Sequence, residues 1–101
     1  MAQFDVYKNI NENSKKNIPY LLDIQNDILK DLTSRVVVPL VVNNKGMKIL
    51  NPEFEIEDKK VIMSTSELAS ISLDNIGEKV CTLKDNREDI ISAIDFLVTG
   101  F

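Results

Sequence analysis

The chain has 101 residues, of which 44% are hydrophobic and 28% charged, and its 12 basic and 16 acidic side chains give a formal net charge of −4. Length and composition indicate a single globular domain over residues 1–101 with a modest core. The acidic balance argues against direct, stand-alone binding to nucleic acid, which excess positive charge drives. A role at DNA would therefore require a DNA-handling partner protein.

Cysteine content and hydropathy bear on where the chain acts. With Cys81 as its single cysteine, the chain cannot form an internal disulfide, which fits a reducing cytoplasm. Its first residues show neither a basic leader nor an apolar run, so no secretory signal is visible. The longest apolar stretch, residues 36–42, contains Pro39 and is too short to span a membrane. We therefore expect a cytoplasmic protein without membrane contact.

The first part of the chain carries strand patterns separated by polar segments. Alternation over residues 3–7 predicts a half-buried strand, and the polar residues 8–17 predict an exposed loop or hairpin tip. A second strand is expected over residues 19–24. A polar segment, 25–34, precedes a β-branched central strand over 35–42.

The next part of the chain adds a turn, a hairpin and further strands. Asn and Gly in residues 43–46 are typical of a turn with positive φ. Residues 53–57 and 61–63 read as the two arms of a hairpin. Residues 68–73 and 79–83 supply one or two more strands.

Residues 85–101 predict an amphipathic helix. Asp85 is placed to cap its start and Glu88, three residues later, to complete a capping box. Five apolar residues at helical spacing form a face that must be buried: Ile90, Ile91, Ile94, Leu97 and Val98. Gly100 is a stop signal that leaves Phe101 as the last residue. This end either presents Phe101 to a partner or tucks its ring into the core.

Together these elements predict a mainly β fold that ends in a helix. The expected architecture is a small, strongly curved antiparallel sheet or open barrel, with the C-terminal helix packed against it. The sequence contains no linker, internal repeat or low-complexity tract.

The residue types that catalysis requires are nearly absent. Without histidine there is no Ser–His or Cys–His pair and no histidine metal site. Cys81 lies in an alternating apolar stretch and is expected to be a buried small hydrophobe. The glutamates of residues 53–57 share one strand face, which we interpret as a solvated surface and not a cation site. With three glycines there is no phosphate-binding loop, and Arg35 and Arg87 are the only arginines. We therefore expect a binding protein that is not an enzyme and has no metal or cofactor.

Six short segments, in order along nearly the whole chain, carry a resemblance to a known family. They are residues 3–7 (QFDVY), 22–29 (LDIQNDIL), 35–40 (RVVVPL), 66–71 (SELASI), 76–78 (IGE) and 86–101. Each is a short apolar pattern of low specificity, but together with a helix ending in glycine plus one large apolar residue they are specific. The chain resembles the CcdB toxin family, the gyrase poisons of toxin–antitoxin pairs.

The resemblance implies a homodimer in which each subunit is an SH3-like barrel of antiparallel strands, CcdB/MazF-like, with a C-terminal helix. It implies binding to the A subunit of DNA gyrase, which is trapped on cleaved DNA. A CcdA-like antitoxin would cover and remove the toxin through a disordered segment, and the two together would repress their own operon. DNA would be contacted only through gyrase or the antitoxin. In this architecture the tip at residues 8–17 and the turn at 43–51 frame a groove for the antitoxin.

The resemblance also assigns a gyrase-binding site residue by residue. The gyrase-facing end of the helix would comprise Asp95, Thr99, Gly100 and Phe101. A neighbouring patch would comprise Ile28 and Leu29, with Asn26 and Phe4 nearby. The sequence departs from the family pattern where a tryptophan, an asparagine and an isoleucine are replaced by Thr99, Asp95 and Phe101, respectively.

Two other functions stay open on the sequence. MazF- and Kid-like endoribonucleases share the barrel, and fold does not settle function. RNA cleavage requires a general base and a cation, and only Arg35 with Asp23 or Glu67 offers them. Because Thr99 replaces the tryptophan, a weakened homologue that binds its antitoxin without activity is the second alternative.

Overall fold

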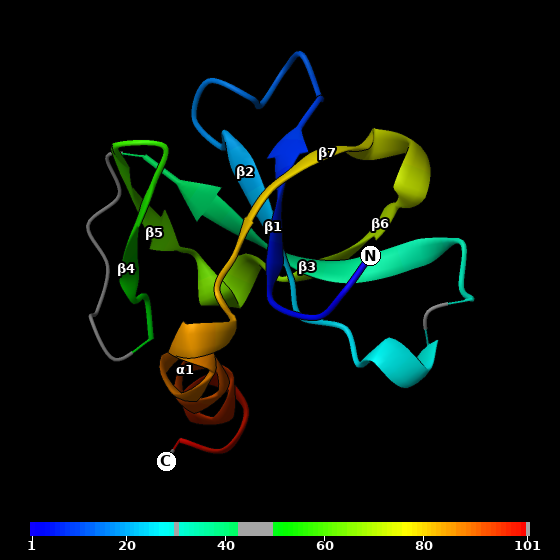
Figure 1. Cartoon of the computed structure of the whole chain (residues 1–101). Coiled ribbons are helices and arrows are strands. Elements are labelled where there is room, and N and C mark those ends of the chain that lie inside the picture. The colour runs from blue at the N-terminus through cyan, green and yellow to red at the C-terminus, as the bar shows by residue number, and fades with distance from the viewer. Residues whose placement is uncertain (30, 43–49, 101) are drawn as a thin grey trace.

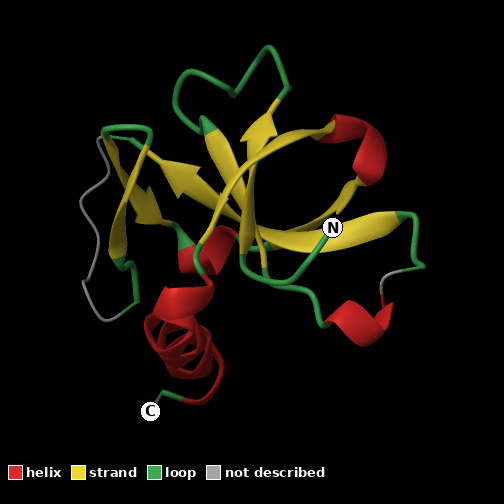
Figure 2. Ribbon diagram, in the orientation of Figure 1, coloured by secondary structure: helices red, strands yellow, loops and turns green. Residues whose placement is uncertain are grey.

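The computed structural model describes residues 1–29, 31–42 and 50–100, which form a curled antiparallel sheet and a C-terminal helix (Figure 1, Figure 2). The strands are β1 (Asp5–Asn9), β2 (Tyr20–Asp23), β3 (Ser34–Val41), β4 (Glu53–Ile56), β5 (Lys59–Met63), β6 (Ala69–Ser72) and β7 (Ile76–Thr82). Short 3₁₀ helices are η1 (Asp27–Leu29), η2 (Thr65–Glu67), η3 (Leu73–Asn75) and η4 (Lys84–Asn86), and the α-helix is α1 (Arg87–Thr99).

The strand order is β4-β5-β3-β2-β1-β7, and β6 pairs with β3 beside this path. The long strand β3 changes neighbours along its length, because residues 34–37 pair with β6 and residues 40–41 pair with β5. Pro39 lies at this change. The Pro39 carbonyl accepts from the Ser64 N–H (2.9 Å), so it points towards the gap between β6 and β5. The nitrogen of the same residue points to the same side, and its lack of a hydrogen therefore costs no hydrogen bond between strands. A proline is therefore tolerated in a central strand.

One face of the sheet forms the hydrophobic core. Alternate residues of β1, β2 and β3 point into it, and α1 closes it with Ile90 and Ala93, both fully buried. The buried cluster comprises Phe4, Val6, Tyr20, Leu22, Val38, Leu40, Phe54, Ile56, Val61, Met63, Leu83, Ile90 and Ala93. Burying each large apolar side chain contributes about 1.5–3 kcal/mol, so this cluster is the main stabilising element.

The opposite face of the sheet is buried too, although it is partly polar. The residues that alternate with the core positions are Asp5, Tyr7, Leu21, Asp23, Arg35 and Val37, each at most 6% exposed. The arch formed by β6, η3 and β7 curves over this face (Figure 1). A cavity of about 360 Å³ is lined by Leu21 and Pro39 of the sheet and by β6 of the arch. The barrel therefore has one apolar and one mixed interior layer.

The predicted strands and C-terminal helix are confirmed, but the predicted start of the helix is wrong. Asp85 lies within η4, and Asn86 precedes α1 without a side-chain cap bond. Because η4 runs directly into the helix, Asp85 lacks the extended backbone that an N-cap requires. The turn predicted at 43–46 lies outside the described residues. Within the described ranges, no helix is long and apolar enough to cross a membrane.

The predicted apolar face of the helix is only partly buried. Ile90 is fully buried, whereas Val98 is 73% exposed and Leu97 is 37% exposed. The core is filled by the first half of the helix, and the second half extends beyond the sheet (Figure 1).

Tyr20 ties the sheet to the β4–β5 turn. Its hydroxyl donates to Glu57 Oε1 (2.6 Å), and burial together with this bond raises the pKa of Tyr20 to about 12. Glu57 was expected on the same strand face as Glu53 and Glu55, but it lies in the turn after β4 with φ of 50°.

The raised pKa of Tyr20 predicts a loss of stability in alkali. Because its ordinary pKa is 10.0, the unfolded state ionises first, so stability is intact below about pH 10 and falls as the pH rises towards 12. Urea unfolding across this range measures the fall. Phenolate absorbance reports the ionisation of both tyrosines, and because burial also raises the pKa of Tyr7, the difference between the wild type and Tyr20→Phe isolates the Tyr20 step. Tyr20→Phe should show a shallower fall, and an equal one would contradict the assignment.

Candidate functional site

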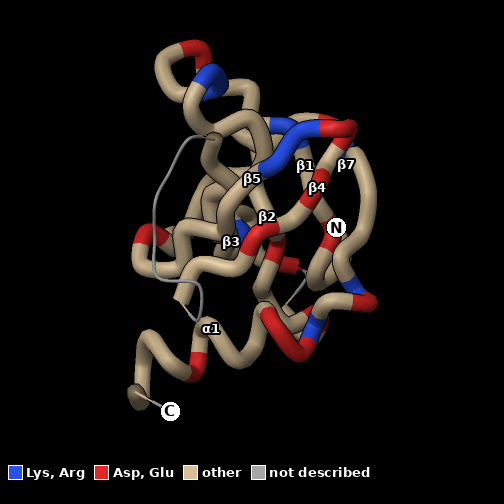
Figure 3. The backbone as a smooth tube through the Cα atoms, turned by 90° about the vertical axis from the view of Figure 1, so that its left-hand side faces the viewer, with Lys and Arg blue, Asp and Glu red and all other residues tan. Residues whose placement is uncertain are grey.

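The C-terminal end of α1 is an exposed, nearly uncharged projection. Asp95 is the only charged residue over residues 90–100, and the tube in Figure 3 is mostly tan towards the C-terminal end of α1. Thr99 is exposed and its hydroxyl donates to the Asp95 carbonyl (2.7 Å). The side chains that line this end therefore offer an apolar surface with one carboxylate.

Gly100 ends the helix in a conformation that suits glycine. Its φ is 80°, and its N–H donates to the Phe96 carbonyl (3.0 Å), a left-handed cap. Among the described residues, no atom lies within 4 Å of the place where a Cβ would sit. The backbone at Gly100 is thus open to close approach by another molecule. Phe101 lies outside the described residues.

The second predicted patch is the η1 turn, which presents two adjacent apolar side chains. Ile28 is 85% exposed and Leu29 is 50% exposed. Asn26 shapes the turn from its start: its side-chain oxygen accepts from the Ile28 N–H (2.9 Å) and its carbonyl from the Leu29 N–H (3.0 Å). The structure therefore displays Asn26, Ile28 and Leu29 together at the surface.

Phe4, the remaining predicted site residue, lies in the core. It is 6% exposed, has φ of 71°, and its backbone N–H donates to the Asp23 carbonyl (2.6 Å). The Arg87 guanidinium lies over its ring, 5.9 Å from the centroid. Phe4 is therefore a buried residue that contacts both β2 and the first residue of α1.

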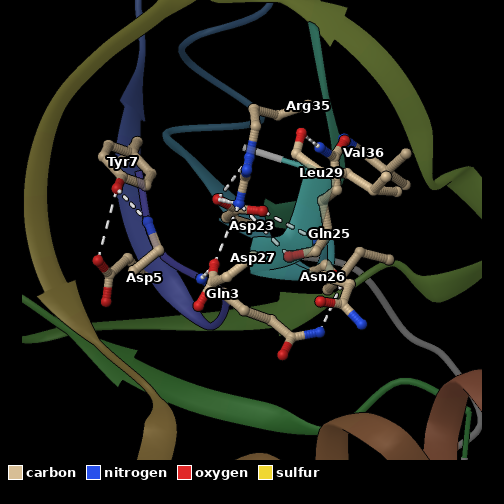
Figure 4. A network of polar contacts seen from close by, with 12 residues as sticks. Gln3, Asp5, Tyr7, Asp23, Gln25, Asn26, Asp27, Leu29, Arg35 and Val36 are labelled. Atoms are coloured by element: carbon tan, nitrogen blue, oxygen red, sulfur yellow. Dashed lines mark hydrogen bonds and ion pairs between the residues drawn. The ribbon is translucent and has the colours of Figure 1, made fainter. Parts of the chain in front are cut away.

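A buried ion pair stands behind the η1 turn (Figure 4). Arg35 Nε and Nη2 donate to Asp23 Oδ2 at 2.9 and 2.5 Å, and both side chains are at most 2% exposed. Burial raises the pKa of the Asp23 carboxyl, while Arg35 and the N–H of Gln25 act in the opposite direction. Among the described residues, Arg35 Nη1 has no hydrogen-bond partner.

Gln25 and Asp27 continue this network towards the surface. The Gln25 side chain donates to the Leu29 carbonyl (2.8 Å) and accepts from the Val36 N–H (3.1 Å). Asp27 Oδ1 accepts from the Gln3 N–H (2.8 Å). Sequence reasoning missed Gln25 and Gln3, although a charge at the end of each of two apolar strands, Asp23 and Arg35, is a visible signal of a buried pair.

The helix end and the η1 turn do not meet within one chain. Figure 1 shows them as two separate projections from the barrel, with α1 and η1 on different sides of the lower edge. A single partner surface would have to span both projections, or a second subunit would have to bring them closer.

The proposed ribonuclease constellation is only partly assembled. Arg35 pairs with Asp23, but the two side chains are sealed inside the barrel. Glu67 instead accepts a hydrogen bond from the Ser64 hydroxyl (2.6 Å). Cys81 is half-buried against the core, and burial raises the pKa of its thiol. Within the described part of the chain, no three potential ligands cluster as a metal site would require.

The predicted antitoxin groove is partly described. The tip between β1 and β2 contributes Asn11, Ser14 and Ile18 to the cavity beneath the arch. Of the other predicted wall, residues 43–51, the part at 43–49 lies outside the described residues. The cavity lining combines amides, hydroxyls and an apolar floor.

Comparison with known proteins decides the family, because residues 3–100 match the family described as CcdB protein. The chain belongs to the CcdB family. The predicted family and the CcdB/MazF-like fold are thereby confirmed. Membership supports the interpretation of the chain as a toxin of a toxin–antitoxin pair.

Solved structures share this fold at low sequence identity. An endoribonuclease in complex with its cognate antitoxin, from mycobacterial species, has a TM-score of 0.78 at 12% identity, covering 97% of this chain and 94% of that chain. Another mycobacterial endoribonuclease has a TM-score of 0.73 at 11% identity, covering 97% and 90%. At these identities the likeness concerns the fold alone.

Proposed function

We propose that this chain is a toxin of a type II toxin–antitoxin pair that binds the A subunit of DNA gyrase and traps the enzyme on cleaved DNA. The observation that carries the proposal is the CcdB family match over residues 3–100. The exposed apolar end of α1 supports it, since an uncovered apolar projection is typical of a protein-binding surface. Action on gyrase would take place in the cytoplasm.

The proposed gyrase contacts are the surface residues of the two projections. They are Asp95, Thr99, Gly100 and Phe101 at the helix end and Asn26, Ile28 and Leu29 at the η1 turn. Phe4, the remaining residue of the predicted site, is buried beside Arg87 at the start of α1, so it would support the site without touching gyrase. Ile28 and Leu29 suit a protein interface because a partner that covers these exposed apolar side chains removes them from water.

The proposal includes a two-fold symmetric homodimer. Apart from the end of α1 that is proposed to contact gyrase, one chain leaves Ile10, Leu73 and Ile91 exposed, which favours a partner subunit. A two-fold axis would place two copies of the helix end on one surface. Light scattering tests this directly, and a mass of 11.4 kDa in solution would contradict it.

A CcdA-like antitoxin is proposed to bind on the side of the β1–β2 tip. A disordered, partly apolar segment that folds onto this side would find hydrogen-bonding groups and an apolar floor in the cavity there. Its binding would compete with gyrase, and the complex would repress its own operon, so that DNA is contacted only through gyrase or the antitoxin. A toxin–antitoxin complex that binds gyrase as tightly as the free toxin does would contradict the proposed competition.

An endoribonuclease is the second candidate, favoured by the fold shared with the mycobacterial enzymes. The burial of Arg35 and Asp23 weighs against it, because cation and base must touch the RNA that they cleave. A weakened, antitoxin-binding homologue is the third.

The experiment that separates these candidates is a gyrase assay with the purified protein. We expect linear DNA to accumulate when the protein is added to gyrase, ATP and supercoiled plasmid, while an RNA mixture incubated with the same protein stays intact. Cleaved RNA would establish the ribonuclease. If neither substrate changes although a cognate antitoxin binds, the chain is the weakened homologue.

A further inference from the structure

We propose that Gln25 is a positioning residue that fixes the η1 turn, so that Ile28 and Leu29 are held ready for a partner. The inference rests on the proposed function for the identity of that partner, the gyrase A subunit. It does not rest on it for the mechanical role of Gln25. The structure assigns this role through contacts that do not involve the exposed side chains themselves.

Apart from the local bonds to Asn26 and the bond from the Gln3 N–H to Asp27, the η1 turn has little to hold it in place. It is a single 3₁₀ turn, Asp27–Leu29, and none of its residues is buried. Short 3₁₀ segments have poor hydrogen-bond geometry and little intrinsic stability. Because Ile28 is 85% exposed, burial of its side chain does not anchor the turn either. The conformation must therefore be imposed by contacts from outside the turn.

Gln25 supplies the link between the turn and the sheet. Its side chain is 6% exposed and both ends of its amide are used. Nε2 donates to the Leu29 carbonyl at 2.8 Å, and Oε1 accepts from the Val36 N–H of β3 at 3.1 Å. One buried amide thus ties the last residue of η1 to a central strand.

The Arg35–Asp23 pair holds Gln25 itself. Asp23 Oδ1 accepts from the Gln25 N–H (3.0 Å), and Arg35 Nη2 approaches the Gln25 carbonyl at 3.4 Å. The same Nη2 lies 3.6 Å from Asp27 Oδ1 at the start of the turn. The contacts therefore run without a break from the buried Arg35–Asp23 pair through the Gln25 amide to the η1 turn at the surface (Figure 4).

The test compares two buried amides that each fasten a loop to the sheet. Gln25→Met removes the link to η1 while nearly preserving side-chain volume. The matched control is Asn9→Leu, because Asn9 is also buried and its side chain donates to the Ile18 carbonyl (2.8 Å) at the β1–β2 tip, far along the chain from η1. Both variants lose buried hydrogen bonds, but only the first loosens the proposed gyrase contact.

Two readouts are measured on the full-length proteins. Amide hydrogen exchange at Leu29 should quicken about tenfold in Gln25→Met relative to the amides of β3 other than Val36, whose N–H also loses its acceptor, and should be unchanged in Asn9→Leu. Affinity for the purified gyrase A subunit should fall about tenfold in Gln25→Met, because binding must then order the turn, and should stay near that of the wild type in Asn9→Leu.

The two readouts separate the inference from the proposed function. Unchanged exchange at Leu29 in Gln25→Met overturns the positioning role, whether or not gyrase binds. Quickened exchange in a protein whose wild type does not bind gyrase upholds the positioning role and rejects the partner. Equal affinity losses in both variants would show that general stability alone matters, and would also overturn the inference. If Gln25→Met does not fold, Gln25→Glu keeps an acceptor for the Val36 N–H and replaces the donor to Leu29 with a carboxylate oxygen, which the Leu29 carbonyl repels.

Discussion

Deletion of Gly100 and Phe101 is expected to abolish gyrase poisoning while leaving the fold nearly intact. Gly100 is exposed, and among the described residues nothing packs where its side chain would be. The deletion removes one cap hydrogen bond, from Gly100 N–H to the Phe96 carbonyl, and should cost about 1 kcal/mol of stability. Removal of an interface anchor commonly costs about 2 kcal/mol or more of binding energy. Activity should therefore fall far more than stability.

Thermal melting and growth inhibition, measured on the same truncated protein, check this ordering. The complementary variant is Thr99→Trp, which adds an exposed ring beside Gly100 and should strengthen poisoning by offering more stacking surface. A truncated protein that still kills, or one that has lost several kcal/mol of stability as a large core deletion would, rules out the helix end as the functional surface.

The strands could be predicted because their local pattern and their final environment agree. In Tyr20–Asp23 and Ser34–Val41, β-branched and aromatic residues fill a sheet that is covered on both faces. The hairpin of β4 and β5 follows from the alternation of Phe54 and Ile56 with glutamates. The order in which the strands pair was harder to predict, because no residue near Pro39 shows that β3 changes its neighbouring strand there.

The starting point of the helix could not be predicted from its capping signals. Asp85 and Glu88 have the spacing of a capping box, yet η4 occupies the residues before Arg87. The bond from Asn86 N–H to the Leu83 carbonyl keeps this segment coiled. The capping-box pattern therefore did not determine where the helix begins, because the η4 turn forms there and also places Leu83 in the core.

The exposed residues of the candidate site could be predicted, but the buried residues that hold them in place could not. The resemblance to the family assigns Ile28 and Leu29 to a contact patch, and both side chains are exposed. Burial of Phe4 and the tether from Gln25 depend on residues far along the chain, which short patterns do not contain. Asp23 and Arg35 were considered as a pair, but charged residues are rarely fully buried, so their depth ran against expectation.

Because Arg35 and Asp23 are both buried, Arg35→Met is the substitution with the largest expected effect on stability. The change leaves Asp23, 0% exposed, without its counter-ion. Breaking a buried pair from one side commonly costs about 3–5 kcal/mol, because an uncompensated charge remains in a low-dielectric interior. Urea unfolding at neutral pH measures the loss. A change below about 1 kcal/mol would show that the pair is not a structural element.

Two further measurements identify the stranded carboxylate as the cause. Burial already raises the pKa of Asp23, and loss of Arg35 removes its main opposing influence. With a folded-state pKa above that of the unfolded chain, stability is greatest at low pH and falls as the pH rises through the folded-state value. The deficit of Arg35→Met should therefore be smaller near the ordinary Asp pKa of 3.8 than at neutral pH. Adding Asp23→Asn, which keeps an acceptor for the Gln25 N–H, should restore more than half of the loss at neutral pH. A double variant no more stable than Arg35→Met would instead attribute the damage to lost packing of the Arg35 side chain.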